Sequence, residues 1–289
     1  MPTYEDFCQL FAADSLVSQM TSQPLFGSTG GQTPFARFID HAETYGPRVI
    51  DRLIRQLPRV SSAVDLGAGT GRDLQLVKRA HPSARLTAIE AGHEYARELS
   101  SRTDFDQLDV QVSNIERDPL PFADESIDLI IANQVLEHTK EIFWIFHEVT
   151  RSLRIKGHFL IGVPNIASLH NRILLLAGHH PTQHKLCSAH VRPFSKRDTV
   201  RFAEACFPGG YSLVNFAGSQ FYPFPTALAR PLARIFPTAA FSIFFLFRKE
   251  LRYVDGFATY PSRAHLETNF WAGERTTGSQ YQEAGILDG

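Results

Sequence analysis

The sequence predicts an α/β fold built around a mainly parallel sheet. Short apolar segments of strand length alternate with amphipathic helical segments from residue 62 to residue 163. Parallel strands need such crossover connections, and they are apolar almost throughout when helices cover both faces of the sheet. The 289 residues are 43% hydrophobic and 20% charged, which is typical of a globular chain and excludes a disordered one.

The expected elements follow in a regular order. The first 60 residues are expected to be helical around a loop at 22–34, which is rich in Gly, Ser, Thr and Pro. Strands are expected at 62–66, 85–90, 109–112, 127–132, 158–163, 211–216 and 241–247. Helices are expected at 72–80, 93–101, 142–153, 166–177 and 195–207, the last one capped by Ser195.

Three regions are expected along the chain: an N-terminal helical extension (1–60), a core (61–252) and a polar C-terminal tail (253–289). The loop at 26–34 is a candidate lid because its glycines can act as hinges.

The insertion at 222–240 is the most individual stretch of the core. It has Leu228, Leu232 and Ile235 on one helical face and is expected to break near Pro231. One interpretation is a flap over the sheet edge. The other is a lid over an apolar or glycolipid-like acceptor, with peripheral membrane contact through basic residues, namely Arg230, Arg234, Arg248 and Lys249.

Charge and cysteine content narrow the function classes. The 29 Lys and Arg balance 30 Asp and Glu, so nucleic acid is not the expected partner. The three cysteines are scattered, which favours a reducing cytoplasm over a secreted disulfide framework. Neither a secretion signal nor a transmembrane helix is expected from the apolar segments.

The strongest local signal is the segment Val64–Gly71, VDLGAGTG. Glycines at alternate positions between a strand and a helix let the backbone turn tightly and approach a ligand. Glu90 ends the next expected strand, where a carboxylate can accept hydrogen bonds from ribose hydroxyls. The spacing between this loop and Glu90 also suits NAD. The dinucleotide fingerprint, however, requires its third glycine at position 72, where this chain has Arg72, so an NAD(P)-dependent oxidoreductase is kept only as the alternative.

Four segments together resemble the class I S-adenosylmethionine-dependent methyltransferases over about residues 40–250. They are VDLGAGTG (64–71), AIEAG (88–92), LPFADESIDLIIANQVLEH (120–138) and RSLRIKGHFLIGVPN (151–165). The resemblance implies a Rossmann-like, doubly wound, seven-stranded sheet that is mostly parallel with an antiparallel last strand, and S-adenosyl-L-methionine as cofactor.

The resemblance also implies roles for individual residues. Asp65 and the loop residues Gly67, Ala68, Gly69, Thr70 and Gly71 would surround the methionine part of the cofactor, and Glu90 with Ala91 would hold the ribose. Asn114 and Ile115 would contact the adenine, with Asn114 standing where the family often has Asp. Asn133, Gln134 and Leu136 would line the pocket near the sulfonium.

Candidate general bases for the acceptor follow the fourth and fifth strands: Glu137, His138, His170, His184 and His190. His138 and His190 rank first, the latter because it begins a His-x-Arg segment similar to one in relatives that act on small or lipid-like acceptors. No metal is expected, since the spacing of the histidine-rich loop at 179–190 matches no standard zinc pattern, although that loop contains ligand-type residues.

The predicted function is methyl transfer to a small-molecule, sugar or lipid-linked acceptor, at oxygen. The segment Asn133–Leu136 stands where nucleobase-amine methyltransferases have Pro-Pro-Tyr, and none of the cysteines follows a proline as the cytosine-carbon type requires. A catalytically inactive cofactor-binding partner subunit is a further alternative, because methyl transfer depends on positioning more than on a nucleophile.

Overall fold

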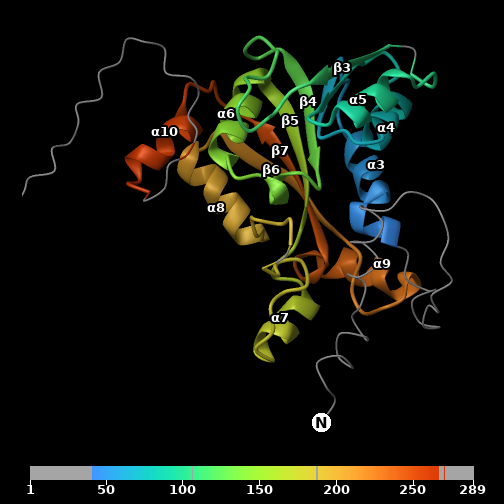
Figure 1. The fold of residues 1–289 in the computed structure, drawn as a ribbon, viewed down its shortest axis with the longest axis vertical. Helices are drawn as coiled ribbons and strands as arrows, with labels where there is room; N and C mark the ends of the chain where they lie inside the picture. The colour runs from blue at the N-terminus through green and yellow to red at the C-terminus, as the bar shows by residue number, and fades with distance from the viewer. Residues whose placement is uncertain (1–40, 106, 187, 267–269, 271–289) are drawn as a thin grey trace, which may run out of the picture.

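The computed structural model describes residues 41–105, 107–186, 188–266 and 270. Its centre is a seven-stranded sheet in the order β3-β2-β1-β4-β5-β7-β6 (Figure 1). The strands are β1 (Ser62–Leu66), β2 (Arg85–Glu90), β3 (Leu108–Val112), β4 (Ile127–Asn133), β5 (Leu153–Pro164), β6 (Tyr211–Ser219) and β7 (Ser242–Lys249). β7 runs antiparallel to both β5 and β6, and the other pairs are parallel. The predicted α/β sheet with an antiparallel last strand is confirmed.

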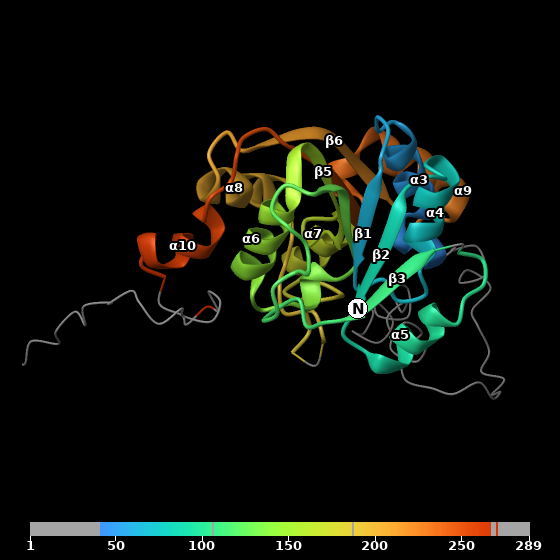
Figure 2. The ribbon, with the colours of Figure 1, turned by 90° about the horizontal axis from the view of Figure 1, so that it is seen from above.

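Helices cover both faces of this sheet (Figures 1 and 2). One face carries α6 (Ile142–Ser152), α8 (Lys196–Cys206) and α10 (Gly256–Arg263), and the other carries α3 (Pro47–Arg55), α4 (Arg72–Ala80) and α5 (His93–Ser100). Successive residues of a strand point to opposite faces. In β4, Ile130 and Ala132 therefore join the core under α6 and α8, whereas Leu129 and Ile131 join the core under α3 and α4.

Several elements differ from the sequence prediction, and β5 and α10 are the first two. β5 begins at Leu153, five residues earlier than expected, and pairs Leu153 with Ile127 before a register shift. Residues 154–156, which follow the buried Leu153, are exposed and lack the apolar pattern of a buried strand. In the segment expected to be a polar tail, α10 buries Phe257 completely, with its ring centroid 5.2 Å from that of Phe146.

The insertion at 222–240 forms α9 (Thr226–Ile235) and η4 (Pro237–Ala239), which pack against β6. The helix continues through Pro231, where the sequence predicts a break. Its buried face consists of the small residues Ala229 and Ala233, which permit close approach to the sheet, whereas Leu228 and Ile235 are 53% and 65% exposed. The predicted apolar face of the insertion is thus largely solvent-facing.

The basic residues near the insertion do not form one surface. Arg230 binds the buried Glu43 through Nε (2.9 Å) and Nη2 (2.6 Å). Lys249 is fully buried, and its Nζ donates hydrogen bonds to the carbonyl oxygens of Thr150 (2.9 Å) and Leu153 (2.7 Å). α9 precedes the first residue of β7, Ser242, which pairs with the last residue of β5. Lys249 ends β7 and therefore lies at the opposite end of the strands from α9. The expectation that Lys249 contacts a membrane surface is therefore wrong.

Part of the N-terminal prediction lies outside the described residues. The candidate lid at 26–34 belongs to that part, as does Cys8, while η2 (His41–Tyr45) and α3 are described. Within the described ranges, no helix is both long and apolar enough to cross a bilayer.

Candidate active site

The glycine loop connects β1 to α4, and all three of its glycines have positive φ: Gly67 at 66°, Gly69 at 52° and Gly71 at 74°. This backbone conformation is costly for residues with a Cβ. An added Cβ would collide with Val135 at Gly67 and with Leu99 at Gly71, so these two glycines also serve packing. At Gly69, an added Cβ would meet no atom within 4 Å, so the middle of the loop borders open space.

Glu90, at the end of β2, is held directly beside this loop. Its Oε2 accepts a hydrogen bond from the backbone N–H of Gly69 (3.0 Å), and its Oε1 accepts one from Gly92 (3.3 Å). Each carboxylate oxygen can accept more than one hydrogen bond, so both keep capacity for a ligand. The structure thus brings together the predicted loop and the predicted ribose-binding acid.

A second acid, Asp73, lies beneath the loop with Asp65. Both are buried, at 6% and 3% exposure. Burial, followed by the charges of Asp73 and Glu90, holds the pKa of Asp65 well above its usual range. Burial also raises the pKa of Asp73, against the lowering effects of Arg72 and of a hydrogen bond from Asn133. Crowded, desolvated carboxylates of this kind favour a cationic or hydrogen-bond-donating ligand.

Unpartnered polar atoms also gather at this edge. Asn133, the last residue of β4, donates from Nδ2 to Asp73 Oδ2 (2.7 Å). The remaining Oδ1 atoms of Asn133 and Asp73, and Nε2 of Gln134, are buried without a hydrogen-bond partner among the described residues. Buried polar groups are normally paired, so these atoms indicate where a ligand would complete the hydrogen bonding.

Asp73 is the residue that the sequence analysis missed. An acid in the first turn of a helix is commonly explained by its favourable interaction with the helix dipole, so its sequence position carries no distinct signal. The only available hint is that it follows the glycine loop directly.

The other predicted cofactor residues differ in burial and in their contacts. Ala68 is buried, whereas Thr70 and Ala91 are exposed. Asn114 forms a local turn in which its Oδ1 accepts from Glu116 N (3.0 Å), and Ile115 packs half-buried against the core. Leu136 is fully buried in the same core. The roles of these residues toward a cofactor stay predictions.

The two histidines ranked first as bases lie next to each other. The ring centroids of His138 and His190 are 4.6 Å apart, and those of His184 and His190 are 6.1 Å apart. The backbone carbonyl of Glu137 accepts hydrogen bonds from Val191 N (2.9 Å) and Arg192 N (3.1 Å), which fix the loop that carries His190 to the end of β4.

Burial sets the protonation of this cluster. It lowers the pKa of His138, and together with the nearby His138 and His184 rings it lowers the pKa of His190 to about 4. Burial raises the pKa of Glu137 to about 8, which the residue's own backbone N–H offsets only in part. Both His138 and His190 are therefore neutral at pH 7, and each keeps a free lone pair on one ring nitrogen.

His170, also a candidate base, lies in a different environment. Its Nδ1 is 3.1 Å from Ser168 Oγ and its Nε2 is 2.8 Å from Thr182 Oγ1, and its ring stacks on Phe241. With both ring nitrogens engaged and 3% of its surface exposed, His170 stabilises the chain segment that follows α7 (Leu169–Leu176).

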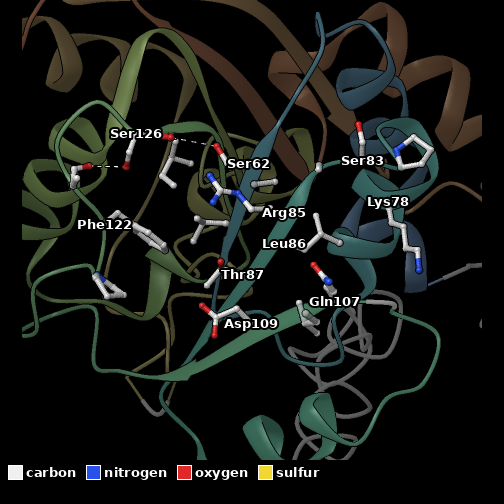
Figure 3. A pocket seen from close by; sticks show the side chains of 18 residues that line it. Ser62, Lys78, Ser83, Arg85, Leu86, Thr87, Gln107, Asp109, Phe122 and Ser126 are labelled. Carbon is white, nitrogen blue, oxygen red and sulfur yellow. Dashed lines mark hydrogen bonds between the residues drawn. The ribbon is translucent and has the colours of Figure 1, made fainter.

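A cavity of about 800 Å³ lies elsewhere, at the amino-terminal ends of β1, β2 and β3 (Figure 3). Ser62, Arg85, Thr87 and Asp109 are among its lining residues. In open α/β sheets, ligands bind at the carboxyl ends of the strands, where the glycine loop and Glu90 are found. We therefore assign the candidate active site to the carboxyl ends of β1 and β2, where the glycine loop and Glu90 lie, and not to this cavity.

Comparison with known proteins identifies a methyltransferase domain in this chain. Residues 64–161 match the family model described as "Methyltransferase domain". A 37.1 kDa protein in transposon TN4556 of Streptomyces fradiae is 33% identical over 132 residues, which are 45% of this chain and 37% of that protein. The malonyl-[acyl-carrier protein] O-methyltransferase of Methylococcus capsulatus is 34% identical over 118 residues, 40% of this chain and 42% of that enzyme. The matched segments are thus less than half the length of these curated relatives.

Solved structures show the same fold. A SAM-dependent methyltransferase from Thermotoga maritima aligns with a TM-score of 0.50 at 18% identity, covering 75% of this chain and 92% of that one. A chain from the complex of the Haloferax volcanii Trm112 methyltransferase activator aligns with a TM-score of 0.51 at 14% identity, covering 74% and 96%. At such low identity, these similarities support the fold alone.

Proposed function

We propose that this class I S-adenosylmethionine-dependent methyltransferase transfers a methyl group to an oxygen atom of a small-molecule, sugar or lipid-linked acceptor. The observation that carries the proposal is the contact between Gly69 and Glu90, which joins a loop bordering open space to a carboxylate at the end of the next strand.

The residues at the loop edge fit S-adenosylmethionine. The open space at Gly69 admits a ligand, and the buried Asp65 and Asp73 suit a molecule with an ammonium and a sulfonium charge. Glu90 with Ala91 would hold the ribose, and Asn133 and the residues after it would lie near the sulfonium. When bound, the cofactor supplies an electrophilic methyl group on sulfur.

The histidine pair, His138 and His190, would remove the proton of the acceptor hydroxyl. A hydroxyl acceptor loses its proton as the new bond to oxygen forms, and a neutral imidazole within reach can take it. We assign this role to Nε2 of His138 or to a ring nitrogen of His190, whose rings lie in contact beyond the end of β4.

Exposed apolar side chains support an acceptor with an apolar chain. α7 and α9 both lie at the lower end of the molecule in Figure 1, beyond the carboxyl ends of the parallel strands. Leu175 and Leu176 on α7 are 52% and 90% exposed, and Ile235 and Phe236 near the end of α9 are 65% and 54% exposed. Apolar surface of this kind commonly marks a binding site or a peripheral membrane contact.

The name of the Methylococcus relative, a malonyl-[acyl-carrier protein] O-methyltransferase, supports oxygen as the accepting atom. It also extends the acceptor class to acyl chains linked to a carrier.

Thermal shift and calorimetry test the cofactor first. S-adenosylhomocysteine should raise the melting temperature and NADH should not, whereas an NAD(P)-dependent oxidoreductase would show the reverse. The protein is then incubated with cell extract and methyl-labelled cofactor, and label is expected in the organic-solvent fraction. Label in nucleic acid would contradict the acceptor class, and cofactor binding without label in any fraction would favour the inactive partner subunit.

A further inference from the structure

Glu137 has a buried carboxyl group beside the ring of His138. Glu137 lies in the short helix η3 (Leu136–His138) after β4 and is 1% exposed. Neither of its side-chain oxygens has a hydrogen-bond partner from another described residue. Within the described ranges, its nearest basic atom is Nε2 of His138, at 3.9 Å from Oε1. A buried carboxyl group whose two oxygens lack hydrogen-bond partners is costly, so this position favours a ligand that those oxygens can bind.

The histidine rings around Glu137 are oriented as metal ligands are. Nδ1 of His138 is 3.3 Å from the carbonyl oxygen of Ala189, so the proton belongs on Nδ1 and the lone pair on Nε2. Metal-binding histidines typically donate their other N–H to a carbonyl or a carboxylate in this way. Nε2 of His138 is also the nitrogen that faces Glu137, and Nδ1 of His190 is buried without a hydrogen-bond partner among the described residues.

We infer that Glu137, His138 and His190 bind a zinc ion at the carboxyl edge of the sheet. One ligand atom from each of these residues lies within 4.8 Å of the others. Ligand atoms of a tetrahedral zinc site are about 3.4 Å apart, given bond lengths of about 2.1 Å, so the side chains close by about 1.4 Å around the ion. Rotation of the three side chains can supply that movement.

The donor set selects the metal. Two imidazoles and one carboxylate suit Zn²⁺, whereas Mg²⁺ prefers oxygen ligands throughout. Three protein ligands with an open position are typical of catalytic zinc sites. The side chain of His138 is 43% exposed, which leaves a fourth position accessible. His184, with its ring 6.1 Å from that of His190, lies nearby as a further donor.

This inference departs from the sequence expectation of no metal. The candidate ligand residues within the 179–190 loop lack a standard zinc spacing, but the fold brings one of them, His190, to Glu137 and His138 of η3. The catalytic meaning of the ion rests on the proposed function. In the zinc-loaded protein the two imidazoles would be ligands and no longer bases, and the ion would lower the pKa of an acceptor hydroxyl, whose proton would pass to solvent water before the oxygen takes the methyl group.

The experiment measures zinc and cofactor binding separately. The full chain is stripped with a chelator, mixed with one equivalent of Zn²⁺, desalted and analysed for metal, with Mg²⁺ as the comparison ion. Wild type is compared with Glu137→Gln, His190→Gln and the control His180→Gln, which changes an exposed histidine outside the cluster. Calorimetry with S-adenosylhomocysteine on the same samples reports whether each variant is folded.

Wild type and His180→Gln should keep about one zinc per chain and no magnesium. Glu137→Gln and His190→Gln should weaken zinc binding by at least about 100-fold, since even groups behind the ligands change metal affinity by about 10–100-fold. All four proteins should still bind S-adenosylhomocysteine. Zinc retained equally by all variants, or by none including wild type, would overturn the inference. Loss of cofactor binding from wild type with zinc retained would instead overturn the proposed function.

Discussion

Replacing Gly69 by alanine separates a ligand-binding glycine from a merely structural one. Gly69 has a φ of 52°, and an added Cβ there would meet no protein atom within 4 Å. If the cofactor occupies that space, the new methyl group collides with the ligand and not with the protein. The substitution should therefore impair binding much more than folding.

The two effects differ in expected size. A residue with a Cβ in the left-handed region costs roughly 1–2 kcal/mol, and the less flexible unfolded chain returns about 0.4–1 kcal/mol. The melting temperature should fall by about 2–4 °C. Overpacking against a ligand costs about 1–3 kcal/mol, which corresponds to an affinity loss of about 5- to 150-fold.

Gly178 provides a matched control, because it also has a positive φ, 77°, and open space around its Cβ position. Gly178→Ala should show a similar fall in melting temperature with unchanged affinity for S-adenosylhomocysteine, measured by isothermal titration calorimetry. Equal affinities of the Gly69→Ala and Gly178→Ala proteins would refute the placement of the cofactor over the loop.

Three further predictions follow. Glu90→Ala should weaken S-adenosylhomocysteine binding by about 10- to 150-fold, the equivalent of charge-assisted hydrogen bonds worth about 1.5–3 kcal/mol, and a change no larger than that of exposed Glu94→Ala would exclude Glu90 as a ligand. Burial lowers the pKa of His170 to about 4, so the unfolded chain binds more protons below pH 6.5 and the unfolding free energy should fall by up to about 1.4 kcal/mol per pH unit from there to pH 4. Urea titrations at several pH values should show a shallower slope for His170→Gln, and an identical slope would contradict this origin. Lys249→Met removes the donor to two buried carbonyl oxygens and should lower the unfolding free energy by about 1–3 kcal/mol or more. Lys156→Met, at an exposed ion pair, should change the unfolding free energy by less than about 1 kcal/mol. Equal effects of the two substitutions would contradict the argument from burial.

The central sheet could be predicted because the residue pattern that specifies each strand lies within one short segment of the sequence. A strand covered on both faces is apolar almost throughout, and residues 127–132 show this pattern within one short segment, with Asp128 as the exception. The glycine loop could be predicted for a similar reason, since positive φ at Gly67, Gly69 and Gly71 is a property that the residue type itself indicates.

The remaining features depend on contacts between distant residues. The role of Asp73 becomes visible only through Asn133, 60 positions away. His138 and His190 could each be chosen from sequence, but the contact between their rings beside the buried Glu137 depends on how the loop before α8 folds back. The orientation of α9 likewise depends on close packing of Ala229 and Ala233, which outweighs the burial of Leu228 and Ile235.

The most direct test of the account is a crystal structure with S-adenosylhomocysteine bound. We expect density over residues 67–71, with the ribose hydroxyls within hydrogen-bond distance of the Glu90 carboxylate. Density in the cavity lined by Ser62, Arg85 and Asp109, or at any place away from Glu90, would contradict the assignment of the site.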